Sequence, residues 1–345
     1  MKTIKNVYKD LLNIENIKKI IFLASKGKTK RGEVKKVLNK IDLYAEKILE
    51  MLKNKTYFMR NSHNKTIIEK GKERILTISP FFPNRILDYI ITETCKPYIK
   101  KSMYEYCVGN VDKRGIMFGK NKIARKYKHY KYYIKLDIHH FYPNVKSNML
   151  LDFISKKVKD KDFLDLVKCV ITSVDEMPIG SYYSQWFSNW YLQELDHLIK
   201  EKLNIPFYIR YVDDMLLMGN NKRKLLNAMY NINRYLNEKG LKLKRFEQVY
   251  QVKKRPIDFL GFRFCKNKII LRVRNFKKLN RKIKKVRKAK HICVSQARSL
   301  MSLIGWLKQT NLGYLYYKNH IKKYVKLGFL KRIISNYDKK IKFTQ

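Results

Sequence analysis

Positive charge is the feature that most constrains how this chain can fold. Its 345 residues include 78 Lys+Arg and 28 Asp+Glu, which gives a formal net charge of +50. Such a charge opposes compaction unless a polyanion neutralises it, so nucleic acid is the first partner to consider and an anionic membrane the second. Yet the chain is 45% hydrophobic and 13% aromatic, with 13 Gly and 7 Pro, which excludes a disordered polycation. The sequence predicts a folded basic protein of about two packed units.

Apolar runs in the sequence are too short for a membrane-spanning protein. Those at residues 20–24 and 215–218 fall far short of the ~20 residues that a spanning helix needs. Residues 1–12 contain no apolar region followed by a small-residue cleavage site, so we expect no secretion. The 5 cysteines are scattered and include no Cys-x-x-Cys pair, which is typical of reduced thiols. We therefore expect a cytoplasmic protein without membrane attachment.

Hydrophobic periodicity predicts a mixture of helices and short strands. Two β segments, 66–68 and 74–78, flank a turn at 70–72, and residues 103–130 read as a loop followed by a short helix at 122–127. Two further β segments, 259–264 and 268–273, read as a hairpin. Apolar residues at helical spacing predict helices over 34–52, 84–98, 149–158, 162–174, 184–202, 222–239, 272–290 and 295–334.

Three acidic residues stand at the ends of predicted strands. Alternation over 132–138 predicts a strand with Asp137 near its end, and apolar β segments on either side of Asp213-Asp214 predict a hairpin with both acids at its tip. Bringing three carboxylates together is costly unless cations occupy the cluster, and hard oxygen ligands suit Mg²⁺. Such a site fits two-metal phosphoryl transfer. The alternative is that Asp213-Asp214 is a solvated turn, since Asp is a common turn residue.

Four segments, in this order, resemble motifs of the reverse transcriptase family. The first palm motif is matched by YIKLDIHHFYPNV at 133–145, the second by MPIGSYYSQWFSN at 177–189 and the third by YVDD at 211–214. The segment IDFLGFRF at 257–264 resembles the strand pair that precedes the thumb. The YVDD signature alone is weak, but four ordered motifs in matching strand, loop and hairpin contexts are specific, and the resemblance covers most of the chain.

The resemblance implies an α+β fold of the right-hand polymerase type. We expect N-terminal helices and fingers over 1–130, a palm with an antiparallel sheet and helices over 131–270 that has finger elements interleaved, and a small basic helical thumb over 271–345. The implied activity is RNA-directed DNA synthesis by two-metal nucleotidyl transfer. Two Mg²⁺ ions, with Mn²⁺ as an alternative, would be held by Asp137, Asp213 and Asp214, and the carbonyl of Ile138 is a further candidate ligand.

The resemblance also assigns residues to the incoming nucleotide. Tyr142, five residues after the first acid, is the candidate steric gate that favours deoxynucleotides, with Phe141 in the core; a slip of one residue in the alignment would exchange these roles. Arg74 and Arg85 fall where related enzymes grip the triphosphate, and ordinary surface or RNA-phosphate contacts are the alternative for both. Lys242 is a candidate general acid for the pyrophosphate leaving group.

The second motif points to a subfamily. Most reverse transcriptases have Pro-Gln-Gly and Ser-Pro there, whereas this chain has Ile179 before Gly180 and Gln185 after Ser184. Both departures are similar to the reverse transcriptases of diversity-generating retroelements. An aliphatic Ile179 removes a polar check on the nascent base pair, so we expect low selectivity, with misincorporation opposite template adenines. Ile179, Gly180 and Gln185 are therefore expected to line the dNTP site, although Ile179 packing under the template base remains an alternative.

Basic residues without acidic partners dominate the predicted helix 272–290, which suits the backbone of a template-primer duplex. The residues expected to contact nucleic acid are Lys277, Lys278, Arg281 and Lys285.

The resemblance leaves three biological roles open. A retroelement enzyme, bacterial or phage-encoded, would copy a structured template RNA with dNTPs, form an RNA/cDNA duplex and work with a basic accessory variability protein, usually a pentamer. The first alternative is a stand-alone bacterial antiphage-defence reverse transcriptase. The second is a non-catalytic RNA-binding protein that kept a polymerase scaffold. Group II intron maturases and retron enzymes are less favoured: maturases usually carry Pro-Gln-Gly and extra C-terminal domains, and the 75 residues after residue 270 leave room for little beyond a thumb.

Overall fold

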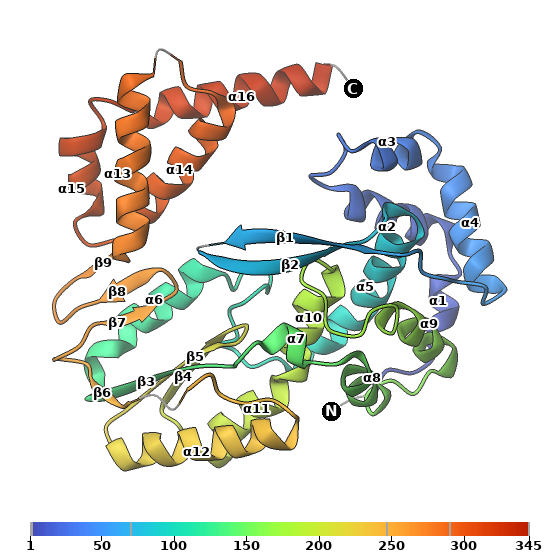
Figure 1. Ribbon diagram of the computed structural model, residues 1–345, viewed down its shortest axis with the longest axis horizontal. Helices are drawn as coiled ribbons and strands as arrows, with labels where there is room; N and C mark the ends of the chain where they lie inside the picture. Colours follow the sequence, from blue (N-terminus) through green and yellow to red (C-terminus); the bar gives the residue numbers. More distant parts are fainter. Residues whose placement is uncertain (1–2, 70, 246–247, 290, 344–345) are drawn as a thin grey trace. The chain divides into compact units, whose positions relative to one another are not determined.

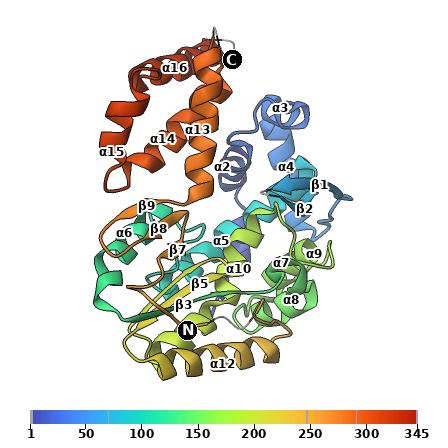
Figure 2. The ribbon, with the colours of Figure 1, turned by 60° about the vertical axis from the view of Figure 1, so that its left-hand side comes forward.

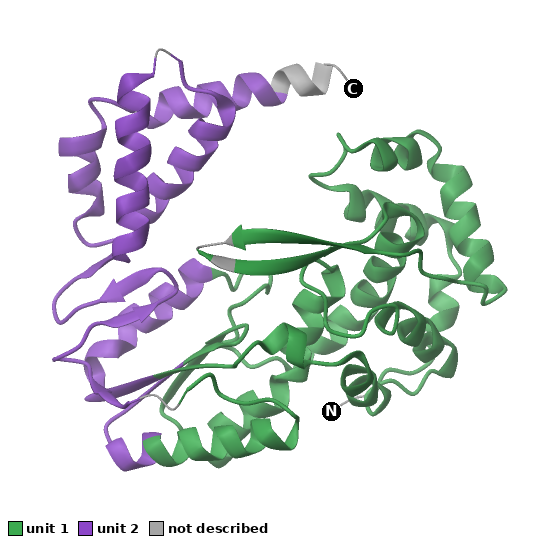
Figure 3. Ribbon diagram, viewed as in Figure 1, with its two compact units in different colours: residues 1–115, 135–215, 226–247 green, residues 116–134, 216–225, 248–345 purple. Residues whose placement is uncertain are grey.

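The computed structural model describes residues 3–69, 71–245, 248–289 and 291–343. These residues form many helices and three small β-sheets (Figure 1). Two compact units divide the chain (Figure 3). Unit 1 comprises residues 1–115, 135–215 and 226–247, and unit 2 comprises residues 116–134, 216–225 and 248–345. The expected mixture of helix and antiparallel sheet is confirmed.

The N-terminal part of unit 1 is helical, and α2 packs against α4 and α5 (Figure 1). The predicted helix over 34–52 is instead two helices that meet at Lys40, whose backbone (φ −131°, ψ 44°) is not helical. The Lys40 amide donates to the Val37 carbonyl, which ends the first helix, while its own carbonyl accepts from Tyr44 and begins the second. The helical elements of this N-terminal part are α1 (Tyr8–Leu11), α2 (Ile14–Ser25), α3 (Gly32–Asn39), α4 (Ile41–Lys53), η1 (Phe81–Arg85) and α5 (Ile86–Ser102).

A two-stranded hairpin projects from this helical part, formed by β1 (His63–Glu69) and β2 (Lys72–Ile78) (Figure 1). Its antiparallel register pairs His63 with Ile78 and Ile67 with Arg74. The predicted pair of β segments is therefore confirmed, and Lys70 of the predicted turn lies outside the described residues. The Thr77 amide donates to the Ile179 carbonyl at 3.0 Å, which ties the hairpin to the second-motif loop.

The helices of the middle segment build an aromatic core in unit 1. Trp190 on α10 is buried and meets Phe153 and Phe187 edge to face, and α10 packs along α5. The predicted helix over 184–202 is broken after Tyr191, where Leu192 (φ −88°, ψ 2°) leaves the helical region. The elements are α7 (Phe141–Asn144), α8 (Ser147–Ser155), α9 (Lys161–Ile171), α10 (Tyr182–Tyr191), α11 (Gln193–His197) and η3 (Leu198–Lys202).

The four-stranded sheet has the order β4-β5-β3-β6. Its strands are β3 (Tyr132–Asp137), β4 (Phe207–Tyr211), β5 (Asp214–Gly219) and β6 (Tyr250–Gln251), and α12 (Lys222–Glu238) follows β5. β4 and β5 are almost wholly buried, which explains why their sequences are apolar runs rather than alternating ones. The three longer strands were predicted, whereas the two-residue β6 was not.

Unit 2 contains a second, three-stranded antiparallel sheet of β7 (Ile257–Phe259), β8 (Phe262–Phe264) and β9 (Ile269–Leu271). A two-residue turn, Leu260-Gly261, joins β7 to β8 with φ values of 51° and 82°. Glycine is required at the second position, because a Cβ there would lie 2.4 Å from the Trp306 ring, which stacks on Phe262. The predicted short helix at 122–127 is longer, α6 (Ile116–Lys126), and is followed by η2 (Tyr127–His129).

Five helical segments of the described residues complete unit 2 (Figure 2). α14 packs against both α13 and α16, and α13 contributes the buried stripe Leu279, Ile283 and Val286 while its charged side chains face outward. The segments are α13 (Val273–Lys288), α14 (Val294–Lys308), α15 (Gly313–Tyr316), η4 (Tyr317–Ile321) and α16 (Leu327–Phe343).

No helix in the described part of the chain is both long enough and apolar enough to span a bilayer.

Candidate active site

Asp213 and Asp214 lie at the tight turn between β4 and β5, in unit 1. β4 ends at Tyr211 and β5 begins at Asp214, so only two residues make the connection. The first of them, Val212, has a φ of 56°, a left-handed conformation that β-branched residues rarely adopt. The hairpin that the sequence predicts is therefore present, and its tip is a strained turn.

Asp137, at the end of β3, lies close enough to this turn to interact with it electrostatically. Burial, and then the negative charges of Asp137 and Asp214, raise the pKa of Asp213 to about 6. Arg74 acts on Asp213 in the opposite direction. The structure thus gathers the three carboxylates that are far apart in the sequence, although their catalytic role stays a prediction.

Two lysines partly neutralise this acidic cluster. The Lys244 Nζ lies 3.5 Å from Asp137 Oδ2, and the Lys135 Nζ lies 3.5 Å from Asp214 Oδ1. In this arrangement, no three His, Cys, Asp or Glu side chains among the described residues are close enough together to hold a metal ion. The donor chemistry nevertheless fits Mg²⁺, because carboxylate oxygens are hard ligands and the negative charges of Asp137 and Asp214 both act on Asp213.

The carbonyl of Ile138 is oriented by a β-bridge. Ile138 faces Leu243 across an isolated antiparallel bridge, and the flanking hydrogen bonds run from the His139 amide to the Lys242 carbonyl and from the Lys244 amide to the Asp137 carbonyl. In such a non-hydrogen-bonded pair the polar backbone groups of Ile138 itself point away from the bridging strand. They point toward the side of β3 on which β5 lies, as a metal ligand there would require.

Tyr142 and Arg74 share the neighbourhood of Asp213. Burial raises the pKa of the Tyr142 hydroxyl; the charges of Asp213 and Tyr211 add to this, while a hydrogen bond with Ser188 and the charge of Arg74 oppose it. Phe141, its neighbour, is only 2% exposed and belongs to the core. The structure therefore brings two of the predicted nucleotide-binding residues together beside the carboxylates, while their function stays a prediction.

Arg85 is engaged within the protein rather than standing free at the surface. Its guanidinium donates to the Gly180 carbonyl at 2.8 Å and to Asp88 at 3.4 Å. Asp88 is buried in α5 and accepts hydrogen bonds from the amides of Tyr182 and Tyr183, both at 2.7 Å. Asp88 thus caps the N-terminus of α10 from another helix, which sequence reasoning missed because nothing near Asp88 in the sequence indicates a cap.

The second-motif loop lies against β2. A Cβ at Gly180, where φ is +122°, would lie 3.0 Å from the Thr77 carbonyl oxygen, and the Ile179 carbonyl accepts the Thr77 amide. The Ile179 side chain is half-buried and Gln185 is exposed on α10. Their contact with a nucleotide stays a prediction.

The segment 241–244 alternates, with Leu241 and Leu243 buried and Lys242 and Lys244 exposed. Sequence reasoning selected Lys242 as a general acid, but Lys244 is the residue that pairs with Asp137. The Leu-Lys-Leu-Lys alternation was the available signal, since it places both lysines on one side of an extended chain. The roles of Lys135 and Lys244 beside the carboxylates were missed.

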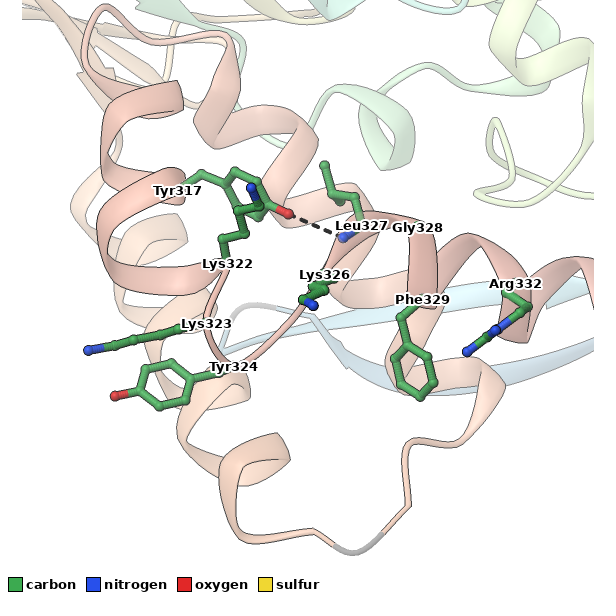
Figure 4. A pocket seen from close by; sticks show the side chains of 9 residues that line it. All are labelled: Tyr317, Lys322, Lys323, Tyr324, Lys326, Leu327, Gly328, Phe329 and Arg332. Atoms are coloured by element: carbon green, nitrogen blue, oxygen red, sulfur yellow. Dashed lines mark hydrogen bonds between the residues drawn. The ribbon is translucent and has the colours of Figure 1, made fainter.

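Unit 2 carries two basic surfaces. The predicted nucleic-acid contacts Lys277, Lys278, Arg281 and Lys285 are all exposed on α13. A pocket of about 750 Å³ lies where η4, the loop after it and the start of α16 meet (Figure 4). Its ring-bearing and cationic lining residues are Tyr317, Tyr324, Phe329, Lys322, Lys323, Lys326 and Arg332.

Comparison with known proteins assigns the family. A family model described as reverse transcriptase (RNA-dependent DNA polymerase) matches residues 33–264. The chain belongs to the reverse transcriptase family. It is also similar to the Retron Ec73 reverse transcriptase of Escherichia coli, with 31% identity over 108 residues. This match covers 27% of the chain and spans about a third (34%) of the relative.

The reverse transcriptase family predicted from the motifs is therefore confirmed, and the matched region includes the three carboxylates. The subgroup is not decided by these comparisons, because the relative belongs to a class that the sequence disfavoured and the match with it is short.

Proposed function

We propose that the chain is an RNA-directed DNA polymerase that works by two-metal nucleotidyl transfer. The observation that supports this most is that Asp137, at the end of β3, acts electrostatically on Asp213 at the β4–β5 turn; burial, and then Asp137 and Asp214, raise the pKa of Asp213 to about 6. A solvated turn would not have a half-buried Asp213 under the influence of a strand end more than seventy residues away in the sequence.

The protein's own residues divide the work. Asp137, Asp213, Asp214 and the Ile138 carbonyl hold the metal ions, and when bound, two Mg²⁺ ions supply the charge that activates a 3′-hydroxyl and neutralises the phosphates. Tyr142 closes over the sugar and excludes a 2′-hydroxyl.

Around this centre, Arg74 binds the triphosphate, and Arg85 acts by holding the Gly180 carbonyl in place. Lys242, or Lys244 beside it, donates the proton to pyrophosphate. Ile179, Gly180 and Gln185 border the base pair.

The right-hand layout is part of the proposal. Fingers and N-terminal helices occupy 1–130, the palm 131–270 and the thumb 271–345. On α13 the exposed residues Lys277, Lys278, Arg281 and Lys285 bind the backbone of the RNA/cDNA duplex. Arg287 of α13 lies over the ring of Tyr324, which lines the basic pocket at the start of α16, so the pocket extends this surface.

Primer extension tests the enzymatic activity. The full chain is incubated with an RNA template, a DNA primer, dNTPs and Mg²⁺, and compared with an Asp213→Ala/Asp214→Ala variant and with a Lys55→Met variant, whose ion pair with Asp162 lies outside the acidic cluster. Extension by the wild type and Lys55→Met but not by the double variant supports the proposal. Equal extension by wild type and double variant refutes it, and RNA binding without extension by any of them supports the non-catalytic alternative.

For the biological role we favour a diversity-generating retroelement in the bacterial cytoplasm, with a structured template RNA and a basic accessory variability protein. Ile179 and Gln185 in the second motif support this choice. Sequencing of the cDNA product tests it: errors concentrated opposite template adenines, and reduced by Ile179→Gln, are expected. Copying that is equally accurate at all four bases would instead favour the stand-alone defence enzyme.

A further inference from the structure

The turn that carries Asp213 is held in a conformation that it would not adopt alone. Val212 has a φ of 56°, and a β-branched side chain in the left-handed region persists only where the surrounding structure imposes it. The residues that impose it can be read from the contacts of Val212. The direct contacts come from β4 and from the segment before α6, and residues of α10 and α11 hold these two contacts in place.

Arg210 makes the first of these contacts. Its side chain is fully buried, and its Nη1 donates to the Val212 carbonyl at 2.9 Å. The guanidinium is fixed in turn by Asp196, which accepts from Nε at 2.7 Å and also from Nη2, and by Asn189 Oδ1, which accepts from Nη1 at 3.0 Å. The position of the Val212 carbonyl is therefore set by a charged network that is shielded from water.

Gly109 makes the second contact. A Cβ built there would lie 2.7 Å from both the backbone nitrogen and Cγ2 of Val212, so only glycine allows this approach. Asn189 Nδ2 donates to the Gly109 carbonyl at 2.6 Å, and the adjacent Val108 amide donates to the Arg210 carbonyl at 2.8 Å. The same Asn189 thus holds both the glycine and the arginine that confine the turn.

We propose that Gly109, Asn189, Asp196 and Arg210 form a clamp that positions Asp213 for catalysis. The four are positioning residues, because Gly109 and Arg210 touch the turn and Asn189 and Asp196 hold those two in place. A buried ion pair is weak support for stability, since apolar residues of similar size often serve as well. This one directs a guanidinium nitrogen at the residue preceding Asp213. The inference rests on the proposed polymerase activity, for which a displacement of about 1 Å can cost on the order of 10²-fold in rate.

Gly109→Ala tests the clamp, with Gly115→Ala as the matched control because no atom lies within 4 Å of a Cβ added there. In folded protein we expect Gly109→Ala to lower kcat for single-nucleotide addition by roughly 10- to 100-fold while the dNTP KM stays within about twofold. Gly115→Ala retains the wild-type kcat.

Rescue separates positioning from general packing. Val212→Gly removes Cγ2, and the wider backbone freedom of glycine lets the nitrogen at 212, which also lies 2.7 Å from a Cβ at 109, move away. Adding Gly109→Ala to Val212→Gly should therefore lower kcat less than adding it to the wild type. A folded Gly109→Ala protein with wild-type kcat, or an equal loss in both backgrounds, would overturn the clamp.

A second arm applies where Gly109→Ala does not fold. Asp196→Leu/Arg210→Met removes both buried charges together, and Tyr208→Phe is its control, because the Tyr208 hydroxyl donates to Asp196 at 2.7 Å. We expect kcat to fall at least tenfold in the double variant and to stay near the wild-type value in Tyr208→Phe. Wild-type kcat in the folded double variant would contradict the clamp.

If the wild-type chain adds no nucleotide, the proposed activity fails on its own. The clamp is then tested by urea unfolding of the wild type, of Gly109→Ala, of Val212→Gly and of the variant that combines these two substitutions. Non-additive shifts of the midpoint are expected, and additive shifts would overturn it.

Discussion

Lys135→Met should lower the Mg²⁺ concentration that the proposed polymerase activity requires. The Lys135 ammonium lies 3.5 Å from Asp214, so it neutralises part of the carboxylate charge that would otherwise attract a metal ion. Methionine has a similar length and no charge, so it removes this competition while keeping most of the packing.

The distance sets the size of the effect. Two unit charges 3.5 Å apart interact by about 1 kcal/mol in a water-like dielectric. Both side chains are more than a third exposed, at 37% and 40%, so this solvent-screened value applies rather than that of a buried pair. About 1 kcal/mol corresponds to a roughly fivefold lower half-saturating Mg²⁺ concentration.

The assay is the rate of single-nucleotide addition as a function of Mg²⁺ at saturating dNTP. Lys55→Met is the control, because it also removes one positive charge from an ion pair, the one with Asp162. A half-saturating concentration equal to or above that of the wild type, with an unchanged dNTP KM, would show that Lys135 does not compete with the metal. A raised dNTP KM would instead place Lys135 in nucleotide binding.

Three further predictions concern stability and nucleic-acid binding. Asp88→Ala removes two buried charged hydrogen bonds at the start of α10 and should lower the unfolding free energy in urea by about 3 kcal/mol or more; a loss no larger than that of the exposed Asp162→Ala would contradict this. Asp160 is a pH-dependent contributor: burial works to raise its pKa, but hydrogen bonds from the amides of Tyr8, Phe163 and Val7 outweigh it and lower the pKa below 3.8. The stabilisation from Asp160 is therefore present above pH 3.8 and is lost as the pH falls through the lowered pKa. The urea midpoint of the wild type should fall more steeply in acid than that of Asp160→Asn. Parallel midpoint curves would show that Asp160 makes no such contribution. Arg281→Gln should reduce the slope of log K against log salt for duplex binding by about 1, measured by fluorescence anisotropy, and an unchanged slope would exclude a phosphate contact.

Local pattern was sufficient to predict the elements that carry the carboxylates. Alternation gave the strand ending at Asp137, and the apolar runs around Asp213 and Asp214 gave the hairpin, because both signals lie within a few consecutive residues. The two-residue strand β6 depends instead on pairing with β3, more than a hundred residues earlier, so no local window contains its cause.

The supporting residues of the site were hidden for the same reason. Asp88 caps a helix ninety-four residues further along, and Lys244 reaches Asp137 across a β-bridge. Arg85 shows the converse, since its residue type suggested phosphate binding while its partner is the Gly180 carbonyl. Residue type and motif spacing identify the residues that are candidates for catalysis and binding. The groups that orient these residues become their neighbours only when the chain folds.

The attachment of the β1–β2 hairpin has a consequence for nucleotide selection. A ribbon of only two strands has little stability of its own, and this one is tied through Thr77 to the backbone of Ile179. Arg74 lies three residues earlier on the same strand. A shift of the second-motif loop would therefore travel along β2 to the arginine. If Arg74 and Ile179 border the nucleotide as proposed, the stiffness of this linkage, as well as the side chain at 179, would govern how strictly a mismatched nucleotide is refused.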